Sequence, residues 1–147
     1  MEGIYWVDFA LLKKFMSDVF THIGIPENEA EICADVLITS DKRGIDSHGI
    51  GRFKPIYIDR IKAGQINPVT KIDVVREAPA TAVLDGNNGM GQVIAHKAMS
   101  MAIEKAHRYG IGMVAVRNSN HYGIAGYYSL MAVKENMIGI KIGRAHV

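Results

Sequence analysis

The stretch that decides the fold is residues 111–136, IGMVAVRNSNHYGIAGYYSLMAVKEN. It begins with the apolar run Ile111 to Val116, which predicts a buried strand. The polar block Asn118 to Gly123 follows, and Ile124 to Asn136 has the spacing of a helix. A strand, a loop and a helix in this order predict an α/β sheet. Such sheets bind ligands at the loops that follow their strands.

The residues on either side of this stretch extend the same pattern. Lys71 to Arg76 and Thr81 to Leu84 are β-branched runs that predict a pair of strands. Asp85 to Gly89 has the composition of a turn, and Gln92 to Tyr109 predicts a long helix that the next glycine ends. From Ile138 onward we expect one further strand.

The first 67 residues predict helices only. The expected helices are Val7 to Ile23, Glu27 to Arg43, and a third segment that runs to Ala63 and is regular from Pro55 to Ile61. The third segment should begin with Asp46 or Ser47 as its N-cap. The fold class is therefore α/β (α+β), with a helical region over residues 1–67 followed by an α/β region over residues 68–147.

Composition narrows the class of protein. The chain has 147 residues, 48% of them hydrophobic, and a net charge of +2 with no basic stripe, so we expect no nucleic-acid partner. Its single cysteine, Cys33, points to a reducing compartment. No apolar run approaches the ~18 residues of a membrane span, and the N-terminus is unlike a signal peptide. We expect a cytoplasmic protein without a membrane partner.

Two polar blocks contain the candidate catalytic and binding residues. The first is Asp46-Ser47-His48-Gly49 with Arg52. A helix start would favour an anion, Arg52 could hold a carboxylate through two hydrogen bonds, and His48 could transfer a proton. A plain helix cap with solvated side chains is the alternative. Gly49 and Gly51, which closely follow His48, favour function, because they weaken a helix. Adjacent side chains diverge, so we do not expect Ser47 and His48 to act as a hydrolase pair.

The second block, Asn118 to Gly123, offers Ser119, Asn120 and His121 as hydrogen-bonding side chains after a strand. Gly123 would let the backbone approach a ligand closely. A polar turn is the alternative, but it needs fewer such side chains. Gly86 to Gly91 lacks the spacing of a dinucleotide fingerprint, so we reject a Rossmann site and expect a tight turn there. No cluster has metal-ligand spacing.

Taken together, these motifs resemble the malate/L-lactate/ureidoglycolate/sulfolactate dehydrogenase family, whose members are NAD(P)-dependent and unrelated to Rossmann-type dehydrogenases. The resemblance covers residues 7 to about 140. It rests on Arg43 to Gly49 with Arg52, on Leu84 to Gly86 with Gly91 and Gln92, and on Asn118 to Tyr128.

The resemblance implies a helical N-terminal region packed on a cofactor domain whose sheet is not of the Rossmann type. It also implies a homodimer that transfers a hydride between NAD or NADP and C2 of a small 2-oxo or 2-hydroxy acid. His48 matches a proton donor or acceptor and Arg52 a carboxylate ligand. His121, with Ser119, Asn120 and Gly123, matches the loop that lines the nicotinamide and substrate pocket. Either histidine could be the main acid or base. Reduction of a cyclic imine is a further option, since related enzymes perform it.

Family members are more than twice as long, so we expect this chain to be an N-terminal fragment with little activity alone. Residues 142–147 resemble a translated sequencing adapter and should have no biological role. A different class of function is also open: a non-catalytic module that binds anions or a partner through an exposed sheet edge. The enzyme hypothesis predicts that His48 and His121 face one cleft, with a reducible carbon held between their rings.

Overall fold

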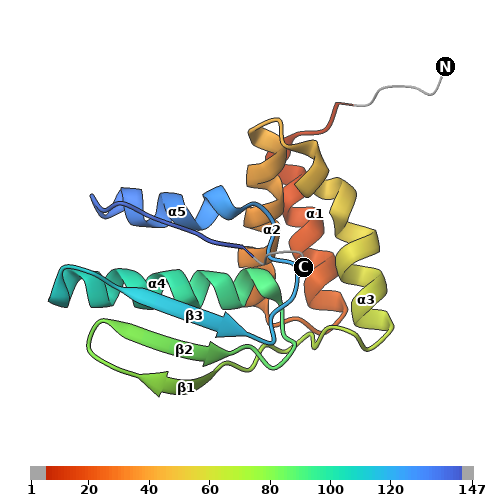
Figure 1. Ribbon diagram of the computed structural model, residues 1–147. Helices are drawn as coiled ribbons and strands as arrows, with labels where there is room; N and C mark the ends of the chain where they lie inside the picture. The colour runs from red at the N-terminus through yellow and green to blue at the C-terminus, as the bar shows by residue number, and fades with distance from the viewer. Residues whose placement is uncertain (1–5, 144–147) are drawn as a thin grey trace.

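The first two helices match their predictions closely in the computed structural model, which describes residues 6–143 (Figure 1). α1 spans Phe9–His22, and its N-cap Asp8 accepts hydrogen bonds from the backbone N–H groups of Ala10 and Leu11 at 2.9 and 3.0 Å. α2 spans Glu27–Lys42. Each observed boundary lies within two residues of the predicted one.

The third helical segment differs from its prediction. It consists of 3₁₀ turns Asp46–His48 and Ile50–Arg52, a π-helix Phe53–Ile58 and a short α3, Asp59–Lys62. The expected N-cap at Asp46 or Ser47 is wrong, because Ile45 precedes the first turn and no side chain caps it. The regular helix expected from Pro55 is also wrong. Proline lacks the N–H that an α-helix uses, and the wider π-turn surrounds that position.

The sheet has three strands in the order β1-β2-β3. β1 (Asp73–Glu77) pairs with β2 (Thr81–Asp85) in antiparallel fashion, as the predicted strand pair requires. α4 (Gly91–Tyr109) connects β2 to β3 (Met113–Arg117), which is parallel to β2. Gly110, with φ +79°, ends α4 as expected. The mixed α/β fold class is therefore confirmed.

Two expectations about the end of the sheet are wrong. β3 is not buried, because its residues alternate between exposed and half-buried, and Met113 is 61% exposed. α4 packs on β3, and no other helix of the described residues has comparable contact with it. α5 (Ala125–Lys134) follows, but residues 138–143 form no strand. Residues 144–147 of the expected adapter-derived tail lie outside the described residues.

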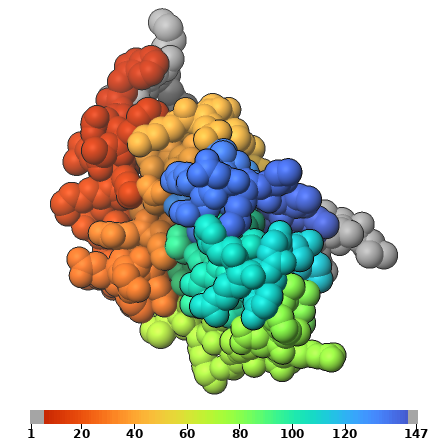
Figure 2. Space-filling view, turned by 90° about the vertical axis from the view of Figure 1, so that its left-hand side faces the viewer, coloured from red at the N-terminus to blue at the C-terminus, as the bar shows by residue number. Residues whose placement is uncertain are grey.

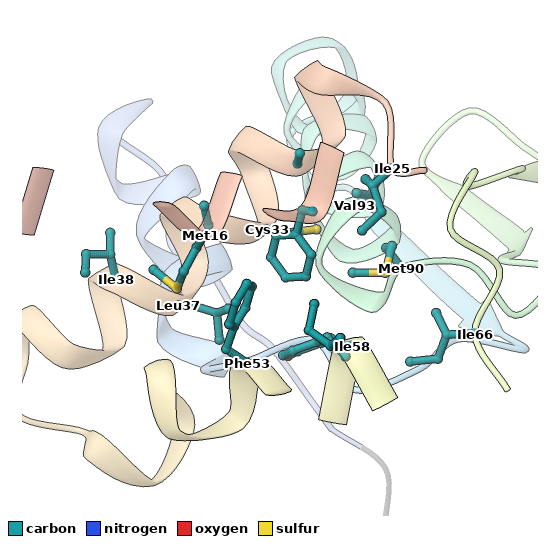
Figure 3. Packing of buried hydrophobic residues seen from close by; sticks show 14 residues of the cluster. Met16, Ile25, Cys33, Leu37, Ile38, Phe53, Ile58, Ile66, Met90 and Val93 are labelled. Carbon is teal, nitrogen blue, oxygen red and sulfur yellow. The ribbon is translucent and has the colours of Figure 1, made fainter. Parts of the chain in front are cut away.

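The main hydrophobic core joins the helical region to the start of α4 (Figure 3). Met16 of α1 and Cys33 and Leu37 of α2 meet Met90 and Val93, so apolar residues from both sides of position 67 share one cluster. The division into regions 1–67 and 68–147 stays a prediction. Figure 2 shows α5 above α4 on one face of the molecule, with the β1–β2 hairpin below them.

Two further observations concern membrane-spanning helices and metal-binding clusters. None of the helices between residues 6 and 143 has both the length and the apolar character needed to cross a membrane. Within the same range, histidine, cysteine, aspartate and glutamate side chains nowhere gather in a group of three that could hold a metal ion.

Candidate active site

The loop after β3, residues 118–123, is fixed to the end of β2 by Asp85. This carboxylate accepts hydrogen bonds from the backbone N–H of Asn87 at 3.0 Å, from Asn118 Nδ2 at 2.9 Å and from Arg117 Nε at 2.8 Å. The Asn87 N–H, followed by the Asn118 amide and the Arg117 guanidinium, lowers the pKa of Asp85. Loop 118–123 is thereby held at the carboxyl end of two parallel strands.

The start of α4 holds the same loop from a second side. Asn120 Nδ2 donates to the carbonyl oxygens of Asn88 and Gly89, both at 3.0 Å. A Cβ on Gly91 would lie 2.3 Å from the carbonyl oxygens of Asn120 and His121, so only glycine permits this contact. The Asn120 amide N–H₂, which the sequence suggested as a cofactor ligand, therefore serves the loop's own structure.

Gly123 and Ser119 differ in what surrounds them. Gly123 has φ +76°, and a Cβ there would lie 2.5 Å from Val36 Cγ1. The structure thus requires glycine for backbone conformation and for packing on α2. Ser119 is exposed, and its hydroxyl makes one long hydrogen bond, 3.4 Å, to the carbonyl oxygen of Asn120. That hydroxyl is accessible to a ligand.

His48 is positioned by a contact between its turn and α2. Asp41 Oδ2 accepts a hydrogen bond from the Ile50 N–H at 2.9 Å, and a Cβ on Gly49 would lie 1.7 Å from Asp41 Oδ1. Gly49 thus makes room for a carboxylate that ties the turn to α2. The Asp46–His48 turn is a single 3₁₀ turn, so the helix start that we expected to attract an anion is absent there.

The two predicted histidines lie together. The ring centroids of His48 and His121 are 5.7 Å apart, with an angle of 22° between the ring planes. The structure therefore brings the two polar blocks together, as expected, and their use as one site stays a prediction. The expectation of a carbon held between the rings stays a prediction. A group sandwiched between the ring faces needs roughly 3.5 Å of clearance on each side, about 7 Å in all, so the rings would have to separate to admit it. A substrate that leaves the rings in place would meet their edges.

The expected divergence of Ser47 from His48 is also wrong. Ser47 Oγ lies 2.9 Å from His48 Nδ1, within hydrogen-bond distance. The two residues belong to a tight 3₁₀ turn and not to the α-helix on which the expectation was based. Arg52 Nε donates to the carbonyl oxygen of Ser47 at 2.6 Å, so the turn also orients the arginine.

Tyr57 is a site residue that sequence reasoning missed. Its side chain is fully buried, and its hydroxyl lies 2.6 Å from His121 Nδ1. The Gly123 N–H also donates to Nδ1, at 3.3 Å. A backbone N–H can only donate, so Nδ1 carries the lone pair and the proton of the neutral ring is on Nε2. Burial raises the pKa of Tyr57, which keeps the phenol protonated as a donor.

Positive charge gathers around the histidines. Burial, followed by the charges of His48, Arg52 and Arg60, lowers the pKa of His121. Arg60 was not predicted as a site residue. Over residues 6–143, neither Arg52 nor Arg60 has a carboxylate within 4.0 Å. Both guanidinium groups are exposed, so they are available to an anionic ligand.

The described residues thus combine an α/β fold with two adjacent imidazoles and two arginines that have no carboxylate partner within residues 6–143. The sequence profile described as malate/L-lactate dehydrogenase matches residues 7–146. The chain belongs to the malate/L-lactate dehydrogenase family.

Known proteins support this assignment. The chain is 55% identical to an L-sulfolactate dehydrogenase of Methanocaldococcus jannaschii over 130 residues, which cover 88% of this chain and 38% of that protein. It is 56% identical to a malate dehydrogenase of Pyrococcus abyssi, covering 89% and 36%. The solved malate dehydrogenase of Entamoeba histolytica superposes with a TM-score of 0.86 at 55% identity, covering 88% and 36%. The chain thus spans less than two fifths of the length of these relatives.

Proposed function

We propose that this chain contributes the proton-transfer and carboxylate-binding groups of an oxidoreductase. The reaction is the reversible transfer of a hydride between NAD or NADP and C2 of a small 2-oxo or 2-hydroxy acid. The observation that carries the proposal is the pair of imidazoles, one of them hydrogen-bonded to a buried tyrosine. Relatives named malate and sulfolactate dehydrogenases support the substrate class.

We assign the proton transfer to His121. Tyr57 and the Gly123 N–H occupy Nδ1, so Nε2 is the atom left to meet the substrate oxygen. In the protonated ring both nitrogens carry a proton. Nε2 gives its proton to the substrate oxygen during reduction, Nδ1–H then donates to the Tyr57 oxygen, and the reverse transfer serves oxidation. A lowered pKa makes the protonated ring a stronger acid and keeps the neutral ring available at pH 7. His48 stacks on this ring and is the alternative acid or base.

We assign the substrate carboxylate to Arg52. Its Nε is bonded to Ser47, which aims the remaining guanidinium N–H groups, and these can bind a carboxylate through two hydrogen bonds. Arg60 adds a second positive charge that acts on His121. Anionic substrates would thus be drawn to the edge of the imidazole pair.

The residues present fit a nicotinamide nucleotide in part. When bound, the nicotinamide supplies or accepts the hydride. Within this chain, the accessible Ser119 hydroxyl, the Asn120 side-chain oxygen and the backbone at Gly123 would hold it. No feature of these residues separates NAD from NADP. A homodimer of the whole protein belongs to the same proposal.

A chimera tests the proposal. Residues 7–137 would replace the matching part of the Methanocaldococcus jannaschii L-sulfolactate dehydrogenase, and NAD(P)H oxidation would be followed with pyruvate, oxaloacetate and glyoxylate. We expect turnover from the chimera and little from the 147-residue chain. A folded chimera that binds NAD(P)H but reduces no 2-oxo acid would contradict the proposal.

A second candidate is a non-catalytic module that binds a partner through the edge of its sheet. The supporting observation is β3, which within residues 6–143 is paired on one side only and has exposed Met113. Ile138, Ile140 and Ile142 are also more than 75% exposed. The isolated chain would then associate in sedimentation experiments, and Val114→Pro or Ala115→Pro on β3 would weaken that association. Association with no activity in the chimera would favour this candidate.

A further inference from the structure

One polar side chain in the interior takes part in none of the hydrogen bonds of the candidate active site. Gln92, the second residue of α4, is 0% exposed, and among residues 6–143 neither its Oε1 nor its Nε2 has a hydrogen-bond partner. Leaving a buried amide unpaired destabilises the fold, and an apolar residue of similar size would avoid that cost. Buried polar groups are nearly always paired, so Gln92 requires a partner.

The position of Gln92 in α4 shows which part of the chain it faces. Ala95 lies three residues further on, on the same side of the helix, and packs against Val36 and Tyr128. Gly123 of loop 118–123 also packs on Val36. Long side chains in a helix lean toward its N-terminus, and there Gly91 touches the carbonyl groups of Asn120 and His121. The Gln92 amide therefore lies beneath loop 118–123.

The same loop contains a backbone carbonyl group that could be this partner. The carbonyl oxygen of Tyr122 accepts the Tyr128 hydroxyl, and that of Asn120 accepts Ser119. For the carbonyl oxygen of His121, the described residues provide no hydrogen bond. An amide and a carbonyl that are too far apart to bond directly can be joined by one internal water, which typically makes about three hydrogen bonds.

We propose that Gln92 is a positioning residue for His121. Its amide, through one internal water, holds the backbone of loop 118–123 at residue 121 from below, while Tyr57 holds the imidazole ring at Nδ1. The role of the Gln92 water bridge in catalysis rests on the proposed function. The existence of the bridge does not depend on that function. A fixed backbone and a fixed ring together determine where Nε2 points.

The test uses the 147-residue chain and its histidine NMR signals. Gln92→Met keeps the volume and removes both polar atoms, and Gln65→Met makes the same change at an exposed position. We expect Q92M to move the titration of His121 to higher pH, because a looser loop admits water. Exchange of the Gly123 amide hydrogen should become at least tenfold faster. Q65M should change neither quantity.

A folded Q92M chain in which His121 and Gly123 behave as in the parent would overturn the proposal, most clearly if its melting temperature also rose. A measurement on the parent does not depend on how the variant folds. Cross-relaxation between the Gln92 side-chain N–H₂ and a long-lived water is expected, and its absence would count against the bridge. An inactive chimera would refute the proposed function while leaving these NMR results unaffected.

Discussion

Gly123→Ala tests whether loop 118–123 lies against α2 as described. Alanine at φ +76° costs about 1–2 kcal/mol, because its Cβ meets the carbonyl oxygen in the left-handed region. The new Cβ would also lie 2.5 Å from Val36 Cγ1, and overpacking of this kind costs about 1–3 kcal/mol. The two terms predict that the free energy of unfolding falls by roughly 2–5 kcal/mol.

Urea denaturation of the 147-residue chain measures this loss, and Val36→Ala separates the two causes. Removing Cγ1 relieves the contact but leaves the backbone strain, so the double variant G123A/V36A should lose less than the two single variants combined. The coupling free energy should be at least ~1 kcal/mol, within the range for residues in contact. Strictly additive losses, or a loss below ~0.5 kcal/mol for G123A, would show that Gly123 does not pack on α2.

Three further predictions concern the site. In the active chimera, His121→Ala should lower kcat at least ~10²-fold, and His48→Ala should lower it less; equal rates for H121A and the parent would exclude His121 as the acid or base. Arg52→Lys should raise KM for the 2-oxo acid more than it lowers kcat, because lysine cannot bind a carboxylate in two-pronged fashion; steady-state kinetics give both constants. The pKa of His121 is lower in the folded chain than in the unfolded one, so the unfolded chain binds the extra proton as the pH falls below the unfolded value of ~6.5. The free energy of unfolding should therefore decrease from pH 7.5 to 5.5, and less steeply in His121→Gln; identical pH dependence would refute the shift.

The sequence was sufficient for the elements with strong periodicity and for the meeting of the two polar blocks. α1, α2 and α4 have long apolar stripes and glycines at their ends. Tertiary packing does not override these local signals, so the helices form where the sequence predicts them. His48 and His121 were both predicted because each follows an element boundary where polar side chains and glycines gather. Their proximity follows from β2, α4 and β3 placing loop 118–123 against α2.

The remaining features depend on contacts that no local pattern contains. Tyr57 lies in the segment that the sequence predicts as a regular helix. Its hydroxyl contacts His121 because a π-helix replaces that helix around Pro55. Gly49 favoured a functional reading because glycine weakens a helix, but its actual partner is Asp41, eight residues earlier. The exposure of β3 depends on which elements cover the sheet, and a strand's own sequence does not specify this.

The central claim is that Tyr57 holds His121 as a neutral ring with its proton on Nε2. Nitrogen-15 NMR of the histidine side chains in the 147-residue chain tests it directly, with Tyr57→Phe as the comparison. The account predicts an unprotonated Nδ1 at pH 7, a His121 titration below the ordinary ~6.5, and an upward shift in Y57F, where the donor to the neutral ring is lost. A protonated Nδ1, or a titration that Y57F leaves unchanged, would contradict it.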